Sequence, residues 1–206
     1  MKPALIVSAF CAAALTAACN NMPGAAPSAT AAYRVDSAQS SINFVTMKAG
    51  APGVGGIGEV QRFSRFGGGM DSSGKISFDV DLASVETGVE IRDERLRTML
   101  FNVKATPQAN FVAQIDPALI GSLPAVGSRD VDVNGNLTLA GQTKPVAAKL
   151  RVARQGNALQ VATRAPIVVD ANQFGLKPGV EAMREVMGLN FLASAAPVTF
   201  TLVLNP

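Results

Sequence analysis

Apolar and polar residues alternate along most of this chain, which is the pattern of strands that bury one face. The alternating runs are short, and glycine, proline and asparagine separate them. Seven to nine strands at this spacing indicate a sandwich or a barrel. The clearest runs are residues 42–44, 76–82, 111–115, 137–139, 146–152, 159–167 and 198–204.

Two segments interrupt the alternation and predict short helices, at about residues 91–104 and 180–188. In the first, Asp93 lies four residues before Arg97, the favourable order for an ion pair on a helix. Pro107 should keep this helix from continuing further. The first helix also carries one apolar stripe at the i, i+3, i+4 and i+7 spacing, formed by Leu96, Met99, Leu100 and Val103.

Glycine-containing turns divide the strands. Residues 134–135 are Asn-Gly and predict a type I′ hairpin, and residues 156–157 predict a second hairpin. The glycine-rich residues 67–74 predict a loop. Residues 53–58 resemble a phosphate-binding glycine loop, but the strand-like residues 59–63 follow them where a helix would be needed. A hairpin or barrel-mouth loop is therefore the better interpretation.

The N-terminal residues have the features of a secretory signal. Lys2 supplies a positive charge, an apolar run at residues 4–18 is too short to span a bilayer, and small residues precede Cys19. Residues 16–19 resemble the bacterial lipobox, in which the cysteine becomes the lipidated N-terminus. We therefore predict a signal peptide over residues 1–19 and lipidation of Cys19, with ordinary cleavage near residues 29–32 as the alternative.

Residues 20–32 are rich in proline, alanine and serine and predict a flexible tether. Asn20 follows the cysteine, and by resemblance to Gram-negative lipoproteins this predicts sorting to the outer membrane. We therefore expect an exported, periplasmic protein that an N-terminal lipid anchor attaches to that membrane.

The rest of the chain has the length of one domain. The formal net charge of +3 for all 206 residues and the lack of a basic cluster argue against nucleic acid as a partner. The chain has no histidine, and its two cysteines are Cys11 and Cys19, so the usual general base and zinc ligands are missing. Residues 130–135 resemble the start of a calcium loop, but Gly141 occupies the place of its essential glutamate. We expect no catalytic residue, no metal and no cofactor.

An ordered set of motifs resembles the YceI-like family, and the similarity covers roughly residues 32–206. It includes residues 33–44, the hairpin segment 135–143 and the late segment 174–176. The resemblance implies a mostly β fold, a lipocalin-like antiparallel barrel of about eight strands with two short α-helices, over residues 33–206. The most specific part of the signature is Asp81, Leu82, Ser84, Val85, Thr87, Gly88, Arg92, Asp93, Leu96, Arg97, Phe101, Pro107 and Phe111.

The same resemblance implies a tunnel that holds a long apolar lipid: an isoprenoid, a quinone, or a fatty acid or amide. It also allows a homodimer. Many relatives have histidines where this chain has Gln39 and Lys48, so any role that needs imidazole is lost here. Phenylalanine alternating in strands is by itself more typical of a plain core, and only the resemblance favours a pocket. The residues expected to line the tunnel are Phe44, Phe63, Phe66, Phe78, Phe101, Phe111 and Phe174.

The charged segment 92–97 supports two interpretations. It is either a solvated helix face with weak internal ion pairs, or Arg92 contacts a ligand head group, because guanidinium binds phosphate well. Three functions follow from the sequence. A lipid-sequestering or lipid-carrying envelope protein leads, a structural or stress-related protein with a filled barrel is second, and a lipid-modifying enzyme is third.

Overall fold

The computed structural model describes residues 31–53 and 55–206, so the predicted signal peptide, Cys19 and most of the tether lie outside the described residues. The strands are β1 Ala31–Ala49, β2 Ile57–Phe63, β3 Phe66–Asp71, β4 Lys75–Asp81, β5 Val85–Glu86, β6 Gln108–Gln114, β7 Ser128–Leu139, β8 Gln142–Gln155, β9 Ala158–Thr163, β10 Ile167–Asp170, β11 Phe191–Leu192 and β12 Ala195–Asn205. The helices are α1 Glu90–Arg95, α2 Ala118–Gly121 and α3 Lys177–Val186, with single helical turns η1 Leu82–Ser84, η2 Leu96–Leu100 and η3 Ala171–Phe174.

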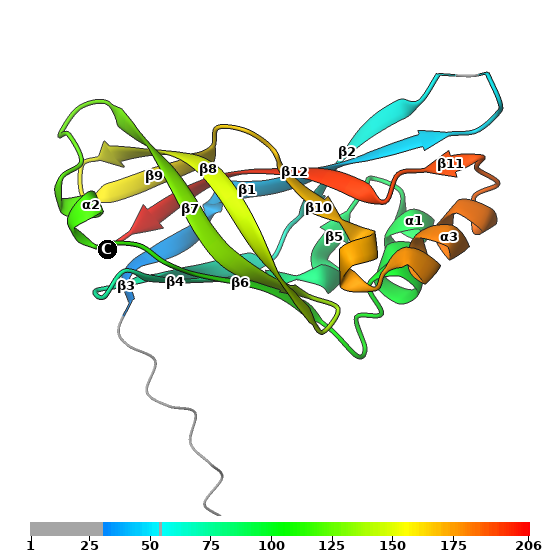
Figure 1. Ribbon diagram of the computed structural model, residues 1–206, viewed down its shortest axis with the longest axis horizontal. Helices are drawn as coiled ribbons and strands as arrows, with labels where there is room; N and C mark the ends of the chain where they lie inside the picture. Colours follow the sequence, from blue (N-terminus) through cyan, green and yellow to red (C-terminus); the bar gives the residue numbers. More distant parts are fainter. Residues whose placement is uncertain (1–30, 54) are drawn as a thin grey trace, which may run out of the picture.

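Eight strands close into the predicted antiparallel barrel. Their order is β1-β3-β4-β6-β7-β8-β9-β12, and β12 pairs back onto β1 to complete the ring. At one end β1 leaves β3 and pairs with β2, while β12 leaves β9 and pairs with β10. The barrel therefore opens into a wider end. In Figure 1, α1 and α3 cover this wider end and α2 lies at the opposite end.

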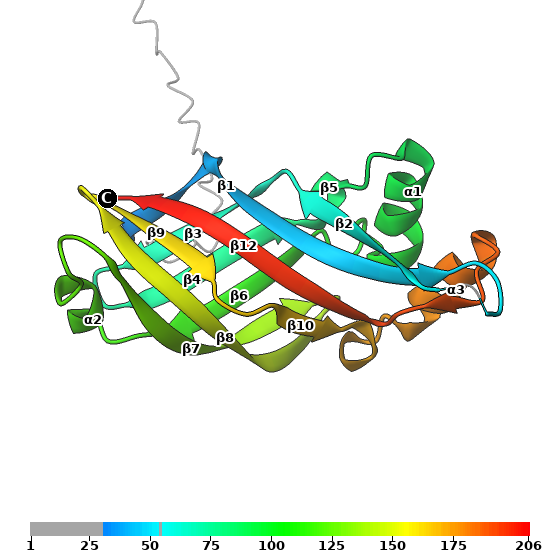
Figure 2. The same ribbon diagram turned by 90° about the horizontal axis from the view of Figure 1, so that it is seen from above.

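Two buried clusters divide the interior along the barrel axis. One fills the barrel proper next to α2 and includes Leu150, Leu159 and Leu202. The other lies under α1 and α3 and includes Phe101 and Met183. Figure 2 shows from above that α1 and α3 lie at one end of the barrel and α2 at the other.

The hairpin predicted at Asn134 and Gly135 is wrong, because the residues before and after it belong to one continuous strand, β7. Asn134 and Gly135 lie inside β7 and pair with β8. The turn is at Ala140 and Gly141, whose φ angles of 49° and 75° fit a type I′ turn. Gly135 serves packing instead, because a Cβ there would lie 2.4 Å from Cζ of Phe111.

The predicted loop at residues 67–74 is mostly strand. Gly68 and Gly69 belong to β3, and only residues 72–74 form the turn into β4. A Cβ on Gly69 would lie 2.0 Å from the carbonyl oxygen of Tyr33 on β1. These glycines permit a close approach of strands, so their enrichment does not indicate flexibility. The hairpin predicted at residues 156–157 is confirmed as the turn between β8 and β9.

Both predicted helices exist with shifted bounds. The first is α1 followed by the π-helical turn η2, in which Phe101 N–H donates to the carbonyl of Leu96. The second begins at Lys177, earlier than predicted, and Pro178 lies in its first turn where a proline is tolerated. The short helix α2 was not predicted.

Replacing Gly135 with alanine is expected to destabilise the barrel by about 2 kcal/mol, because the new methyl group must displace the Phe111 ring or the β6 backbone. Urea unfolding of the two proteins measures this difference. Gly67→Ala is the matched control, because a Cβ there has no atom within 4 Å. Equal effects of the two substitutions would show that the close packing at Gly135 is not the cause.

Candidate functional site

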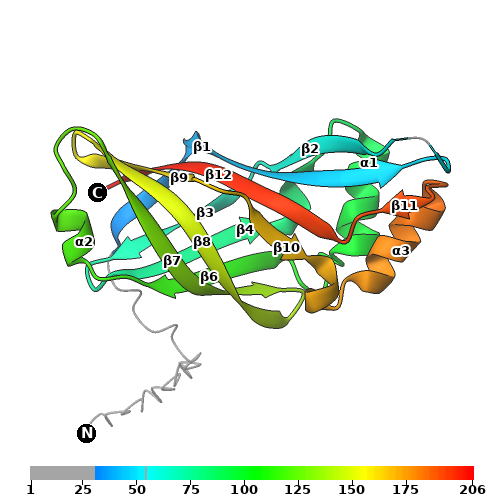
Figure 3. The same cartoon turned by 45° about the horizontal axis from the view of Figure 1, so that its top comes forward.

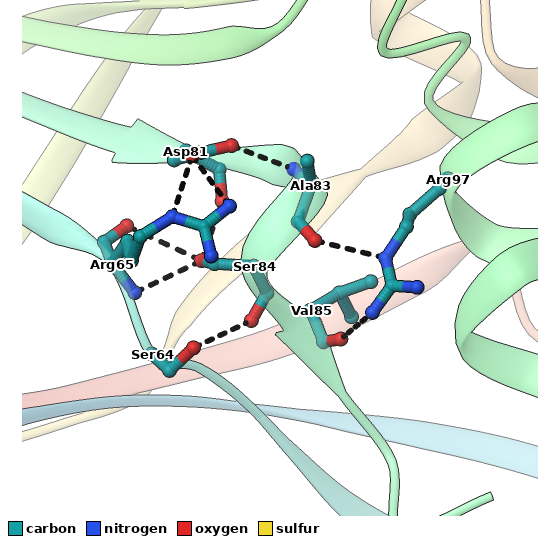
Figure 4. A network of polar contacts seen from close by, with 7 residues as sticks. All are labelled: Ser64, Arg65, Asp81, Ala83, Ser84, Val85 and Arg97. Carbon is teal, nitrogen blue, oxygen red and sulfur yellow. Dashed lines mark hydrogen bonds and ion pairs between the residues drawn. The ribbon is translucent and has the colours of Figure 1, made fainter. Parts of the chain in front are cut away.

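A polar network fixes the turn between the barrel and its helical cover (Figure 4). Ser84 is buried, donates from Oγ to the carbonyl of Asp81 at 2.6 Å, and accepts from the N–H of Arg65 at 3.0 Å. Asp81 caps η1 by accepting from the N–H of Ala83, and its carboxylate also pairs with the Arg65 guanidinium at 2.8 Å. The network therefore joins the short segment between β2 and β3 to the turn η1.

Two charged residues then hold the helical segment onto this turn. Arg97 donates from Nε to the carbonyl of Ala83 at 2.8 Å and from Nη2 to the carbonyl of Val85 at 3.3 Å. Asp93 is buried and accepts from both the N–H and the hydroxyl of Thr87, at 2.8 and 2.6 Å. The predicted Asp93–Arg97 ion pair is wrong, because each side chain binds backbone or hydroxyl groups of the preceding turn instead.

The barrel encloses two neighbouring cavities of about 220 Å³ each. The outer cavity lies beneath α1 and α3, and the inner cavity lies in the barrel proper and reaches Leu119 and Ile120 at α2. Every residue that lines the inner cavity is apolar. Figure 3 shows the two ends of the barrel, with α1 and α3 at one end and α2 at the other. The residues that line both cavities are Ile42, Val80, Leu137, Val169 and Val198.

Polar side chains gather in the outer cavity, on β1, β2 and α1. Glu59 accepts from Lys48 Nζ at 2.9 Å with one carboxylate oxygen and from Arg92 Nη1 at 2.9 Å with the other. Gln61 and Thr46 come next along the same faces of these strands, and Gln61 Nε2 donates to Thr46 Oγ1 at 3.3 Å. The interior thus has one polar end and a long apolar remainder.

Six of the eight residues predicted to bind a ligand line these cavities. Phe44, Phe63, Phe101 and Arg92 line the outer one, and Phe78 and Phe111 line the inner one. The Phe44 and Phe63 rings stack with centroids 5.2 Å apart. Their contact with a ligand stays a prediction.

The other two residues lie elsewhere. Phe174 is buried in the cluster under the helices but is not among the lining residues. Phe66 packs against Phe78, with ring centroids 6.1 Å apart, and lines neither cavity. Phe174 is buried in the turn η3 and Phe66 is partly buried in β3, so each ring packs in the core without reaching the open space.

Sequence reasoning missed the polar residues of the outer cavity other than Arg92. Glu59 and Gln61 alternate with Val60 and Arg62 along β2, so the period-2 pattern could have placed them on one face. Lys48 was noted only as a replacement for histidine, and it lines the outer cavity. Gln39, the other replacement, donates to Asp36 at an exposed irregularity in the pairing of β1 with β12.

The acidic segment that resembled a calcium loop forms regular strand pairs in β7. Asp130 accepts from Arg151 at 2.9 Å and from Arg164 at 2.8 Å. The hydrogen bond from Arg151, together with the charges of both guanidinium groups, lowers the pKa of the Asp130 carboxyl. This acidic group therefore joins β7, β8 and the end of β9 on the outer surface.

Among residues 31–53 and 55–206, no helix is both long enough and apolar enough to cross a bilayer.

Comparison with known proteins identifies the family of this chain. A family model, the YceI-like domain, matches residues 33–204. "Protein YceI" of Salmonella arizonae is 36% identical over 87 residues, which cover 42% of this chain and 41% of that protein. The match thus spans less than half the length of this curated relative.

Two solved structures share the fold. A polyisoprenoid binding domain from Saccharophagus degradans, implicated in plant cell wall breakdown, is 30% identical, with a TM-score of 0.79, over 85% of this chain and 98% of that one. BcnA of Burkholderia cenocepacia is 22% identical, with a TM-score of 0.61, over 82% of this chain and 98% of that one. The latter likeness is one of fold alone. With its barrel, its helical cover and a family match over nearly all the described residues, this chain belongs to the YceI-like family.

Proposed function

We propose that this protein sequesters or carries a long apolar lipid, a polyisoprenoid or a related chain, inside its barrel, without catalysis. The observation that carries the proposal is the interior itself, in which an entirely apolar inner cavity follows an outer cavity with a polar end. This arrangement suits a molecule with a small polar head and a long hydrocarbon tail. The relative from Saccharophagus degradans, described as a polyisoprenoid binding domain, supports the ligand class.

Burial of hydrocarbon supplies the binding energy. Each methylene group removed from water contributes about 0.8 kcal/mol, so a chain that occupies both cavities needs few polar contacts. A filled-barrel structural protein, the second function considered from the sequence, would need side chains that meet across the axis. The two cavities favour the lipid-binding alternative over it.

Competition with a fluorescent fatty acid tests the proposal. Unlabelled prenyl lipids of increasing length should displace the probe from the purified protein, with affinity rising until the chain fills the inner cavity. An affinity that does not depend on chain length would contradict the proposal, because it would place the lipid on the surface. A lipid that is released chemically altered would favour the enzyme alternative.

We further propose that the chain is exported and attached to the outer membrane through lipidated Cys19, which lies outside the described residues. Substituting Cys19 with serine should move the protein from the membrane fraction to the soluble periplasmic fraction and abolish labelling by a palmitate analogue. A wild-type protein that is already soluble and unlabelled would favour ordinary cleavage near residues 29–32. The homodimer stays a prediction.

A further inference from the structure

One buried polar atom in the outer cavity has no hydrogen-bond partner among the residues that the structure describes. It is Oε1 of Gln61, a residue that is 2% exposed and lines this cavity. Within the same part of the chain, the Gln61 amide nitrogen donates to the Thr46 hydroxyl alone. Because a hydroxyl can donate or accept, the amide can also be turned over. In either orientation one end of the amide remains free, and an unpaired buried amide costs free energy that a ligand can recover.

Gln61 lies between the apolar and the charged parts of the cavity. It is directly opposite Phe44 in the β1–β2 ladder, and the next inward residue on its strand face is Phe63. In the other direction the next pair is Thr46 with Glu59, where the ion pairs to Lys48 and Arg92 begin. A lipid whose tail occupies the inner cavity would therefore bring its head group to the Gln61 amide.

The charged side chains at the polar end of the outer cavity form ion pairs with one another. Both carboxylate oxygens of Glu59 are occupied, one by Lys48 and the other by Arg92. The three side chains together carry a formal charge of +1, and a carboxylate lies between the two cations. A diphosphate group would have to approach that carboxylate or displace it, and like charges in a partly desolvated site repel strongly.

From these contacts we infer that Gln61, Thr46 and the Lys48–Glu59–Arg92 cluster form a head-group subsite for a compact, uncharged, hydrogen-bonding group such as a hydroxyl, an amide or a quinone carbonyl. A diphosphate of the same chain length is the disfavoured alternative. This inference rests on the proposed lipid-binding function and assigns its specificity. The free amide of Gln61 selects for polarity, and Glu59 selects against negative charge.

Three ligands with identical prenyl tails test the inference on the full chain as the cell processes it: a hydrocarbon, an alcohol and a diphosphate. The alcohol should bind about tenfold more tightly than the hydrocarbon, the value of one hydrogen bond to a buried group. In Gln61→Leu this ratio should fall to about one. An unchanged ratio would overturn the role of Gln61. If none of the three ligands binds to the wild type, the proposed function itself fails.

A separate variant tests the selectivity against negatively charged head groups. Glu59→Gln leaves two cations without their carboxylate, so affinity for the diphosphate should rise about tenfold relative to the alcohol. Glu94→Gln is the matched control, because it removes an exposed carboxylate of α1 that lines neither cavity, and it should leave this preference unchanged. Tighter binding of the diphosphate than of the alcohol by the wild type would overturn the inference. So would an equal response of the two variants.

Discussion

Val169→Trp is expected to lower the affinity for long prenyl lipids on the order of 100-fold. Val169 lines both cavities, so an indole there would close the passage between them. A chain denied roughly 100 Å² of apolar contact loses about 2.5 kcal/mol, and each 1.4 kcal/mol is a factor of ten. Short prenyl lipids that fit the outer cavity alone should lose much less affinity. Titration with a series of chain lengths measures both effects.

Val168→Trp is the matched control, because Val168 is the neighbouring residue of β10 and is 65% exposed. It should bind long lipids like the wild type. The chain has no natural tryptophan, so each variant carries a single fluorescent reporter, and only the indole at residue 169 should respond to ligand. A Val169→Trp protein that folds and still binds long chains normally would contradict a continuous passage through the barrel.

Asp93→Ala is expected to lower the free energy of unfolding by about 3 kcal/mol. Asp93 is 8% exposed, and its carboxylate accepts from the N–H and hydroxyl of Thr87. The substitution leaves these groups unpaired next to a buried site, and bonds to a charged acceptor are among the stronger ones. The same substitution should weaken the attachment of α1 to the wider end of the barrel. Chemical denaturation measures the loss.

Asp93→Asn should recover part of the loss, because its amide oxygen can still accept from the Thr87 N–H. Glu94→Ala should change stability by less than about 0.5 kcal/mol, because the Glu94 side chain is 60% exposed and its ion pair with Arg97 is long, at 3.9 Å. If Asp93→Ala were no more destabilising than Glu94→Ala, then Asp93 would not anchor the helical cover.

Much of the architecture could be predicted from the sequence, because alternation and the family motifs both depend on local order along the chain. The barrel, the strand runs and the two main helices follow from them. The roles of two glycines were predicted wrongly. Gly135 and Gly69 permit close packing across strands, whereas we predicted a turn at Gly135 and a loop around Gly69. The partner that approaches a glycine lies on another strand, and a single-sequence pattern does not contain it.

The candidate site was predicted in part for a related reason. Apolar alternation led to Phe44, Phe63, Phe78 and Phe111, which line the cavities. The polar residues Glu59 and Gln61 were missed, because a polar side chain in a strand normally faces solvent. Their position inside depends on the register of β1 with β2, and a shift of one residue would turn them outward.

Native mass spectrometry of the protein, exported to the periplasm and purified without detergent, would detect a lipid held in the barrel. We expect a stoichiometric additional mass that fragments as a long prenyl chain with a small uncharged head group. A bound fatty acid or amide would keep the barrel-binding function and change the ligand class. A protein that carries no such mass, and that also fails to bind added prenyl lipids, would show that the barrel is not a lipid-binding site.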